Sequence, residues 1–458
     1  MIIYENQENA LPRWLTEQKN GGYRIDELSF VVMLKQDYGI RYIGGQFYDD
    51  HGLLCADKLR HIIQKHIGLY FDHHTTVMTD QLFKAVKYYG YEEPPVPAEN
   101  EIHCLNAHLT ITDDGQILPL DPIFSLHRMH VLYDRDAPVP ALWTRYLHDL
   151  LEDEDIPTLQ EFLGYCLVPT TKAQKALFLI GSGGEGKSRL TVLLHRLFGD
   201  SMVQDSLQAV QENRFTPALL AQRLLFLDDD LQTAKLQNTG TFKTLVTAET
   251  SILVERKGVD KYPIRPYCRF LGLGNQPLGA CYDHSEGFYR RLLVLRCKPV
   301  SPERVNDPAL ADALCEELPG IFNWMLEGLL RLRRQRYRFT VSDASQAYLA
   351  AMKRQENNIE EFLSDRTMLA YDPTFSETSA NLKLAYQLWC RYNAATPLSD
   401  RTLFEYLKEH QAEYGLSYRK LRRGKIDCRG YRGVRVLPAI HSEPPVRHEP
   451  PVRHKPEA

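Results

Sequence analysis

The chain has 458 residues, 43% of them hydrophobic, and a formal net charge of −4 at pH 7, an ordinary composition for a globular protein of two to four domains. No apolar run approaches the roughly 18 residues of a membrane-spanning helix, and the start lacks a secretory signal pattern. The nine cysteines are scattered singly, which disfavours a disulfide framework or a zinc site. We expect a cytoplasmic protein with no membrane partner. With this net charge, any nucleic-acid binding would have to come from local basic patches.

Residues 1–140 mix short strand and helix signals, which predicts a separate domain that serves as a collar or docks a partner. Ile40–Gly52 is typical of a small hairpin, and segment 56–66 of a helix. A second helix is expected over 79–89, with Thr79 as its N-cap. The proline-rich stretch 92–100 is expected to be a linker.

From residue 141 to residue 335 helical patterns alternate with short apolar runs. These runs predict buried strands at 176–180, 223–230, 269–275 and 291–297. Strands that alternate with helices indicate an α/β fold with a mainly parallel, doubly wound sheet. A helical stretch from Leu310 to about Arg333 is expected to close this domain.

The first of these strands ends on a glycine loop that matches the P-loop pattern, with a helix after it. Its glycines would let backbone N–H groups approach phosphate oxygens, and the helix N-terminus adds partial positive charge. Lys187 is expected to reach the β- and γ-phosphates of ATP, and the Ser188 hydroxyl to ligate Mg²⁺. A chance glycine turn is the alternative, which the flanking strand and helix disfavour. The predicted nucleotide-binding residues are Gly181, Ser182, Gly183, Gly184, Glu185, Gly186, Lys187 and Ser188.

Three aspartates follow the second long apolar strand, where acids would face the phosphates. Asp228 is predicted to hold Mg²⁺, and Asp229 to orient and deprotonate the attacking water. Asp230 leaves the register ambiguous by one residue. The alternative is a solvated acidic turn.

Two further polar positions lie at strand ends. Asn275 follows the next apolar run and could hydrogen-bond the γ-phosphate or the lytic water. Arg290 and Arg291 precede the last strand and could stabilise the transferred phosphoryl group, often from a neighbouring subunit. Taken alone, the Asn-Gln-Pro sequence at Asn275 is more typical of a turn, and the arginine pair is equally typical of a solvated strand edge.

The order of these motifs, all between Gly181 and Arg291, resembles superfamily 3 helicases, which are AAA+ P-loop ATPases. The resemblance is to the helicase part of phage and plasmid primase-helicases, including the poxvirus primase-helicase, and it covers about Ile40 to Leu330. It implies that Asn275 is a sensor, that Arg290 or Arg291 is a finger acting in trans, and that the chain forms a ring, usually a hexamer.

The resemblance also assigns residues to DNA. Lys243 matches a lysine between the acidic strand and the Asn-tipped strand. Segment 251–266 corresponds to a hairpin that lines the central channel, where Arg256, Lys257 and Lys261 would hold the phosphates of one DNA strand. A Gly-Val-Asp turn crowded with cations agrees with that role, and a surface hairpin with solvated charges is the alternative.

Two departures from the family matter. The acidic strand ends in three aspartates where relatives often carry glutamate, so the base is not assigned. The chain is also too short for the upstream polymerising domain, so primer synthesis is not predicted, and the aspartate pair of the YDRDAP turn is not taken as a primase metal site.

Residues 336–440 are predicted to form a C-terminal module. An amphipathic helix over 398–410, capped by Ser399 or Asp400, precedes a basic two-stranded ribbon. This pattern suggests a winged-helix-like DNA binder, with a solubilising ribbon as the alternative. Its predicted DNA-binding residues are Arg419, Lys420, Arg422, Arg423, Lys425, Arg429 and Arg432. The tail, 441–458, repeats EPPVRH and is expected to be disordered.

Together these features predict an ATP-dependent replicative DNA helicase of a phage, plasmid or other mobile element. It would move on single-stranded DNA, 3′-to-5′ by resemblance, open forked duplexes, and work beside a separate primase or polymerase. A replication initiator of the same fold that melts an origin is the closest alternative. A small-molecule kinase or other P-loop transferase, and a DNA-binding adaptor with a degenerate ATP site, are more distant alternatives.

Overall fold

The computed structural model describes residues 11–437, apart from residue 20, segments 232–238, 276–285 and 302–306, and residues 357, 394, 396, 424 and 425. The chain divides into two compact units. The first extends to Ser342, and the second comprises the chain from Asp343 onward together with the described residues 239–240 and 286–290. Among the described residues, no helix has both the length and the apolar character needed to cross a membrane.

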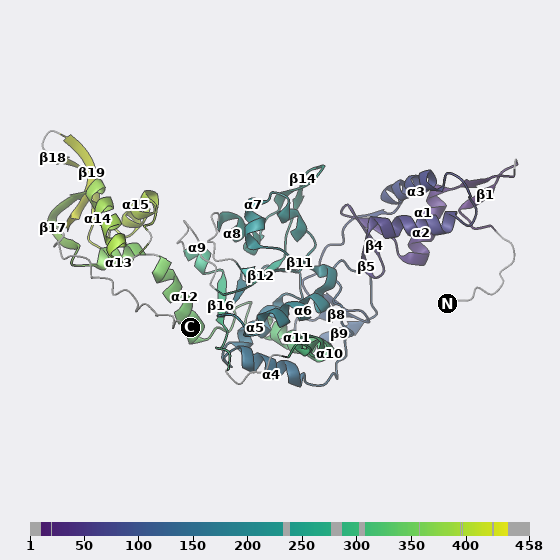
Figure 1. Ribbon diagram of the computed structural model, residues 1–458, viewed down its shortest axis with the longest axis horizontal. Helices are drawn as coiled ribbons and strands as arrows, with labels where there is room; N and C mark the ends of the chain where they lie inside the picture. The colour runs from purple at the N-terminus through teal and green to yellow at the C-terminus, as the bar shows by residue number, and fades with distance from the viewer. Residues whose placement is uncertain are drawn as a thin grey trace, which may run out of the picture. The chain divides into compact units, whose positions relative to one another are not determined.

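A five-stranded sheet lies at the centre of the first unit, and all its neighbouring pairs are parallel (Figure 1). The strand order is β11-β12-β15-β10-β16. Every residue of β10 and β15 is buried, which explains their continuous apolar sequence. The predicted parallel α/β core is confirmed. Its strands are β10 (Ala176–Ile180), β11 (Met202–Gln204), β12 (Leu225–Leu231), β15 (Arg269–Gly274) and β16 (Leu292–Arg296).

Five helices pack around this sheet: α4 (Ala141–Leu150), α5 (Ile156–Tyr165), α6 (Lys187–Phe198), α10 (Leu310–Glu316) and α11 (Leu318–Arg334). The expected continuous helix over 310–333 is two helices, with a break at Glu317. The Glu317 carboxylate accepts hydrogen bonds from the backbone N–H groups of Leu142 and Trp143, at 3.0 and 2.9 Å. It therefore caps the start of α4, whose own N-cap residue, Pro140, has no side-chain acceptor.

Helices α5 and α11 cross closely because glycines lie at the contact. A Cβ atom on Gly164 would lie 2.3 Å from the carbonyl oxygen of Met325, and one on Gly328 would lie 2.3 Å from that of Gln160. Either substitution would force the backbones apart. Nearby, Glu161 is fully buried, pairs with Arg331 at 2.7 Å, and accepts the backbone N–H of Thr340 at 2.7 Å.

The first unit also contains α7 (Leu207–Glu212), η1 (Gly199–Ser201), η2 (Thr216–Leu220) and most of α8 (Thr239–Thr247), whereas α9 (Glu286–Tyr289) groups with the second unit. The predicted hairpin over 251–266 is confirmed as β13 (Ile252–Arg256) and β14 (Val259–Ile264), which pair antiparallel.

The amino-terminal part of the first unit has its own apolar cluster beneath three helices. The predicted hairpin at residues 40–52 is confirmed and extended to a third strand. The helix predicted to start after Thr79 is an exception: it begins at Thr75, and the Thr79 hydroxyl donates to the Thr75 carbonyl at 2.7 Å inside it. The elements are β1 (Leu15–Glu17), β2 (Tyr23–Ile25), α1 (Glu27–Tyr38), β3 (Arg41–Ile43), β4 (Gln46–Asp49), β5 (Gly52–Leu54), α2 (Ala56–Ile67), α3 (Thr75–Tyr89) and β6 (Tyr91–Glu92).

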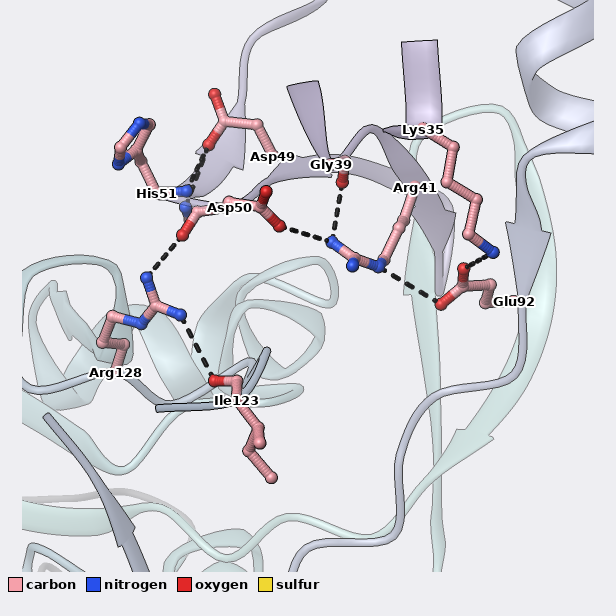
Figure 2. Close-up of polar contacts among 10 residues, drawn as sticks. Lys35, Gly39, Arg41, Asp49, Asp50, His51, Glu92, Ile123 and Arg128 are labelled. Atoms are coloured by element: carbon pink, nitrogen blue, oxygen red, sulfur yellow. Dashed lines mark hydrogen bonds and ion pairs between the residues drawn. The ribbon is translucent and has the colours of Figure 1, made fainter. Parts of the chain in front are cut away.

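Ion pairs of Arg41 hold the β3–β6 sheet together, and hydrogen bonds of Arg128 connect it to the following chain (Figure 2). Arg41 donates to the carbonyl oxygen of Gly39 at 2.7 Å and to Asp50 at 3.0 Å, and lies 3.6 Å from Glu92. Arg128 donates to the carbonyl oxygens of Asp50 and Ile123. A three-stranded antiparallel sheet, β7 (Glu101–His103), β8 (His108–Ile111) and β9 (Ile117–Leu120), lies between this part and the central sheet in the chain.

The second unit contains a three-stranded antiparallel sheet in the order β17-β19-β18, with helices beside it (Figure 1). Ser399 caps the predicted helix by accepting from the Thr402 N–H at 3.2 Å, which resolves the choice between Ser399 and Asp400. The elements are α12 (Asp343–Glu356), α13 (Asn358–Ser364), β17 (Leu369–Thr378), α14 (Ser379–Tyr392), α15 (Asp400–Glu409), β18 (Ser417–Arg423) and β19 (Ile426–Val436).

Candidate nucleotide-binding site

A cavity of about 1130 Å³ lies at the carboxyl ends of β10, β15 and β12. Because these strands are parallel neighbours, the residues that follow each of them meet at one edge of the sheet. The lining includes the glycine loop from Gly183 to Ser188, the acids Asp229 and Asp230, and Asn275. The structure therefore brings together most of the site that the sequence predicts.

The glycine loop has the backbone that its sequence predicts. Gly183, Gly184 and Gly186 have φ angles of 106°, 86° and 95°, a region that side chains with a Cβ rarely occupy. Lys187 is the first residue of α6, so the loop leads directly into a helix N-terminus. The Tyr146 hydroxyl donates to the Gly186 carbonyl at 3.1 Å, which fixes the loop from the side of α4.

Within the loop, the Glu185 carboxylate is the partner of Lys187. The two side chains are 2.7 Å apart and are 2% and 10% exposed. The carboxylate also accepts the Gly183 N–H at 2.8 Å and the Ser182 hydroxyl at 3.0 Å. Burial alone would raise the pKa of Glu185, but these hydrogen bonds outweigh it and lower the pKa to about 2. A phosphate that enters the loop must therefore share Lys187 with this carboxylate.

The three aspartates of β12 divide into two environments. Asp228 is buried and accepts the backbone N–H of Leu207 at 2.8 Å and that of Asp230 at 3.3 Å. It therefore supports the first turn of α7, and burial raises its pKa. Asp229 and Asp230 are both exposed and both line the cavity. A register shift against β15 between Asp228 and Leu231 makes this possible, because a bulge breaks the strict alternation of side chains.

The position of Asp228 disfavours its predicted role as a ligand of Mg²⁺. It is not among the described residues that line the cavity, so its Mg²⁺-binding role stays a prediction that the geometry does not favour. Asp229 and Asp230 are placed better for that role.

Asn275 lines the cavity immediately after β15, as the sequence predicts. Neither arginine of the predicted finger belongs to the described lining. Arg290 is exposed, and Arg291 is buried with its carbonyl accepting the Ala176 N–H at 2.9 Å. A trans-acting role for either stays a prediction.

Several lining residues were missed by the sequence analysis. Helix α4 contributes Arg145, His148 and Asp149, and the chain after β16 contributes Lys298 and Ser301. Arg145 and Lys298 add positive charge beside the glycine loop. No motif marks them: α4 has the spacing of an ordinary amphipathic helix, and only its packing places it at the cavity.

The cations of the β13–β14 hairpin differ in their availability. Lys257 and Lys261 are exposed. Arg256 is partly buried, donates to the Gly44 carbonyl at 3.1 Å, and lies over the Tyr262 ring at 5.4 Å. Lys243 lies on α8 and is partly buried. Of this set, Lys257 and Lys261 are therefore the more accessible to a phosphate backbone.

In the second unit the predicted basic residues lie on the β18–β19 ribbon. Cross-strand register pairs Lys420 with Arg429, so these two and Arg422 share one face, whereas Arg419 and Arg432 lie on the other. All five are exposed. Lys420 pairs with Asp427 at 2.8 Å. Arg423 lies on β18 with its side chain outside the described atoms, and Lys425 lies outside the described residues.

Comparisons with known proteins agree with a core of this kind. A family model described as a family of unknown function (DUF5906) matches residues 179–291, the segment that holds the glycine loop, the three aspartates and Asn275. A DNA primase-polymerase of Nitratiruptor phage NrS-1 is 26% identical over 132 residues, which is 28% of this chain and 18% of the phage protein. The chain thus spans less than a fifth of that relative's length.

Solved structures extend the likeness in fold. An apo structure of the NrS-1 C-terminal region aligns with a TM-score of 0.53 and 13% identity, and covers 90% of this chain and 100% of that one. A second apo form of the region gives a TM-score of 0.51 and 13% identity, over 88% and 97% of the two chains. This chain therefore resembles the C-terminal region of a phage primase-polymerase in fold.

Proposed function

We propose that the chain is an ATP-driven DNA helicase of a phage or related mobile element, with ATP and Mg²⁺ bound in the cavity at the end of the parallel sheet. The observation that carries this proposal is the meeting of Lys187, Ser188, the pair Asp229–Asp230, and Asn275 around one cavity. A phosphate-binding loop, paired acids and an amide at neighbouring strand ends are the parts that nucleotide hydrolysis requires.

The cavity suits both ligands. Its volume of about 1130 Å³ is slightly above that of most small-molecule pockets, which span roughly 300–1,000 Å³, and leaves room for a nucleotide. The Ser188 hydroxyl and the Asp229 and Asp230 carboxylates are hard oxygen ligands of the kind that Mg²⁺ prefers. The ion would supply charge neutralisation on the phosphates. The backbone N–H groups of the loop and Lys187 would hold those phosphates in place.

The paired acids and Asn275 would act on water. One carboxylate of Asp229 or Asp230 would accept a proton from the attacking water, and the Asn275 amide would orient that water or the γ-phosphate. A finger from Arg290 or Arg291 would come from a neighbouring copy, since neither lines the described cavity. That requirement favours a closed ring, for which we propose a hexamer.

The order of the sheet supports the AAA+ assignment. Strand β15, which carries Asn275, lies between β10 with its glycine loop and β12 with its acids. As a sensor, the Asn275 amide would lie between the bound phosphates and the acids that hold the metal ion.

DNA binding is proposed for two surfaces. In the first unit, Lys257 and Lys261 on the β13–β14 hairpin would contact a single strand. In the second unit, the order α13-β17-α14-α15-β18-β19 with sheet order β17-β19-β18 supports a winged-helix-like module. Helix α15 carries two cations, Arg401 and Lys408, against the three acids Asp400, Glu405 and Glu409. The basic ribbon, more than this helix, therefore suits phosphate contacts.

The function is tested by strand displacement on a forked DNA duplex with ATP and Mg²⁺, with Lys187→Ala as the control. We expect displacement by the wild type and none by the variant. DNA-stimulated hydrolysis without displacement would favour an initiator that requires its origin or a partner. Hydrolysis indifferent to DNA would contradict the helicase proposal and favour a P-loop transferase.

A further inference from the structure

A histidine pair and a glutamate lie together on the β7–β8 hairpin, away from the residues that line the nucleotide cavity. The strand register places His103 of β7 directly opposite His108 of β8. Glu101 precedes His103 by two residues, so both point from the same face of β7. Three side chains with metal-binding atoms therefore share one face of a short hairpin.

The separations between these atoms suit a single ion. The Glu101 Oε2 atom lies 3.3 Å from the His108 Nε2 atom and 3.8 Å from the His103 Nε2 atom. One ligand atom from each of the three residues can be chosen so that all lie within 4.8 Å of one another. Tetrahedral zinc with bonds near 2.0–2.1 Å places neighbouring ligand atoms about 3.3–3.5 Å apart. Small side-chain rotations would bring all three atoms to that spacing.

The histidine rings also have unsatisfied nitrogens. They stack with centroids 4.7 Å apart and planes within 14°. The buried His108 Nε2 atom makes no hydrogen bond, although the Glu101 carboxylate lies 3.3 Å from it, and the buried His103 Nδ1 atom has no hydrogen-bond partner among the described residues. A buried polar atom without a partner costs about 1–3 kcal/mol and calls for an explanation. An ion held through the Nε2 atoms would satisfy the first of them directly.

We propose that Glu101, His103 and His108 bind one Zn²⁺ ion that fastens the β7–β8 hairpin. Two imidazoles and a carboxylate form a recognised zinc ligand set, with water as the fourth ligand. The Glu101 side chain is 32% exposed while the histidine side chains are 13% and 10% exposed, so the ion enters from the glutamate side. The scattered cysteines argued against a zinc site in the sequence, but this site uses none of them.

Arg128 is a cation beside the histidines: it forms a backbone bridge with His103, and its charge acts on that ring. Its guanidinium donates to the carbonyl oxygens of Asp50 and Ile123 (Figure 2). The Glu101 carboxylate, 3.3 and 3.8 Å from the two rings, would offset half of the ion's charge. None of the three ligands lines the nucleotide cavity, so the ion would act on the hairpin and not on the nucleotide.

The proposal is tested on the full chain, stripped with a chelator and reloaded with zinc. Bound zinc is measured by mass spectrometry and its affinity by competition with a chromophoric chelator. We expect one Zn²⁺ per chain, a higher melting temperature with zinc, and weakening of about tenfold or more in Glu101→Gln and His108→Ala. His61→Ala removes an exposed histidine of α2 and should leave the affinity unchanged.

Two results would overturn the proposal. One is a wild-type chain that binds no zinc after reloading. The other is an affinity unchanged in both Glu101→Gln and His108→Ala, which would assign the zinc to other histidines, such as His441, His448 and His454 of the tail. If His108→Ala fails to fold, an unchanged affinity in Glu101→Gln alone overturns the proposal. The Glu101 side chain is partly exposed, so its replacement tests binding in a folded chain.

Discussion

In the central sheet, three neighbouring parallel strands deliver the glycine loop, the Asp229–Asp230 pair and Asn275 to one edge. In the C-terminal unit, an antiparallel ribbon spreads its cations over two faces, with Lys420 and Arg429 on one and Arg419 on the other. Parallel strands concentrate function at their carboxyl ends, whereas an antiparallel ribbon distributes it along its length. Single substitutions should therefore have large effects in the first region and small, cumulative effects in the second.

The largest effect is expected for Lys187→Ala. Loss of the ammonium that we propose contacts the phosphates should reduce ATP turnover on the order of 100- to 1,000-fold, the range for removing one preorganised electrostatic contact. Steady-state phosphate release measures this. DNA affinity without nucleotide should be unchanged, because the ribbon is intact. A parallel loss of DNA binding would contradict the separation of the two regions.

The next largest effect is expected for whichever of Asp229 and Asp230 acts as the general base. Asp229→Asn and Asp230→Asn should show which carboxylate is the base, with turnover falling about 100-fold or more for that residue. Asp228→Asn is the matched control, since it keeps the shape of a buried side chain. It should lower stability by about 1 kcal/mol through its bond to the Leu207 N–H, and change turnover little. A turnover loss in Asp228→Asn as large as in its neighbours would show that the cavity geometry misassigns the acids.

A smaller effect is expected on the ribbon. Arg429→Ala should reduce the slope of log affinity against log salt for single-stranded DNA by about 1, and Arg419→Ala by a similar amount. Fluorescence anisotropy across a salt series measures it. Arg401→Ala on α15, whose side chain pairs with Glu405 at 2.9 Å, is the control and should leave the slope unchanged. An equal fall for Arg401→Ala would indicate that the helix contacts the phosphates too.

The smallest effect is expected for Glu185→Gln. The amide keeps the size of the side chain but removes the charge that holds Lys187 at 2.7 Å, so nucleotide should bind a few-fold more tightly. Titration with a fluorescent ATP analogue measures this. Weaker binding in the variant would show that the carboxylate positions the lysine for phosphate instead of competing with it.

The sequence predicted the parts of the site whose residues are adjacent in the chain, but not the parts that only folding brings together. The glycine loop is a local pattern whose flanking strand and helix can be seen in the chain, so its residues and backbone were predicted together. The choice among the three aspartates depends on a bulge against β15, which only strand pairing creates. Arg145 and Lys298 reach the cavity through packing of α4 and the chain after β16, and their local sequences carry no signal of that.

The same distinction holds for the fold. Buried parallel strands were predicted because their apolar runs are continuous, and the Ser399 cap because capping is local. The break at Glu317 has a local signal, because Pro319 lies in the first turn of α11. What the sequence does not show is that the Glu317 carboxylate caps α4, more than 170 residues away in the chain. Thr79 has the side chain of a cap but lies one turn inside α3, where its hydroxyl bonds the preceding turn.

The proposed DNA-dependent ATPase is tested most directly by ATP hydrolysis by the wild-type chain with and without single-stranded DNA, in parallel with Lys187→Ala. We expect hydrolysis that requires Mg²⁺, rises several-fold with DNA, and is lost in the variant. Hydrolysis at the same rate with and without DNA, or hydrolysis that survives Lys187→Ala, would contradict the proposal that ATP hydrolysis in this cavity drives movement on DNA.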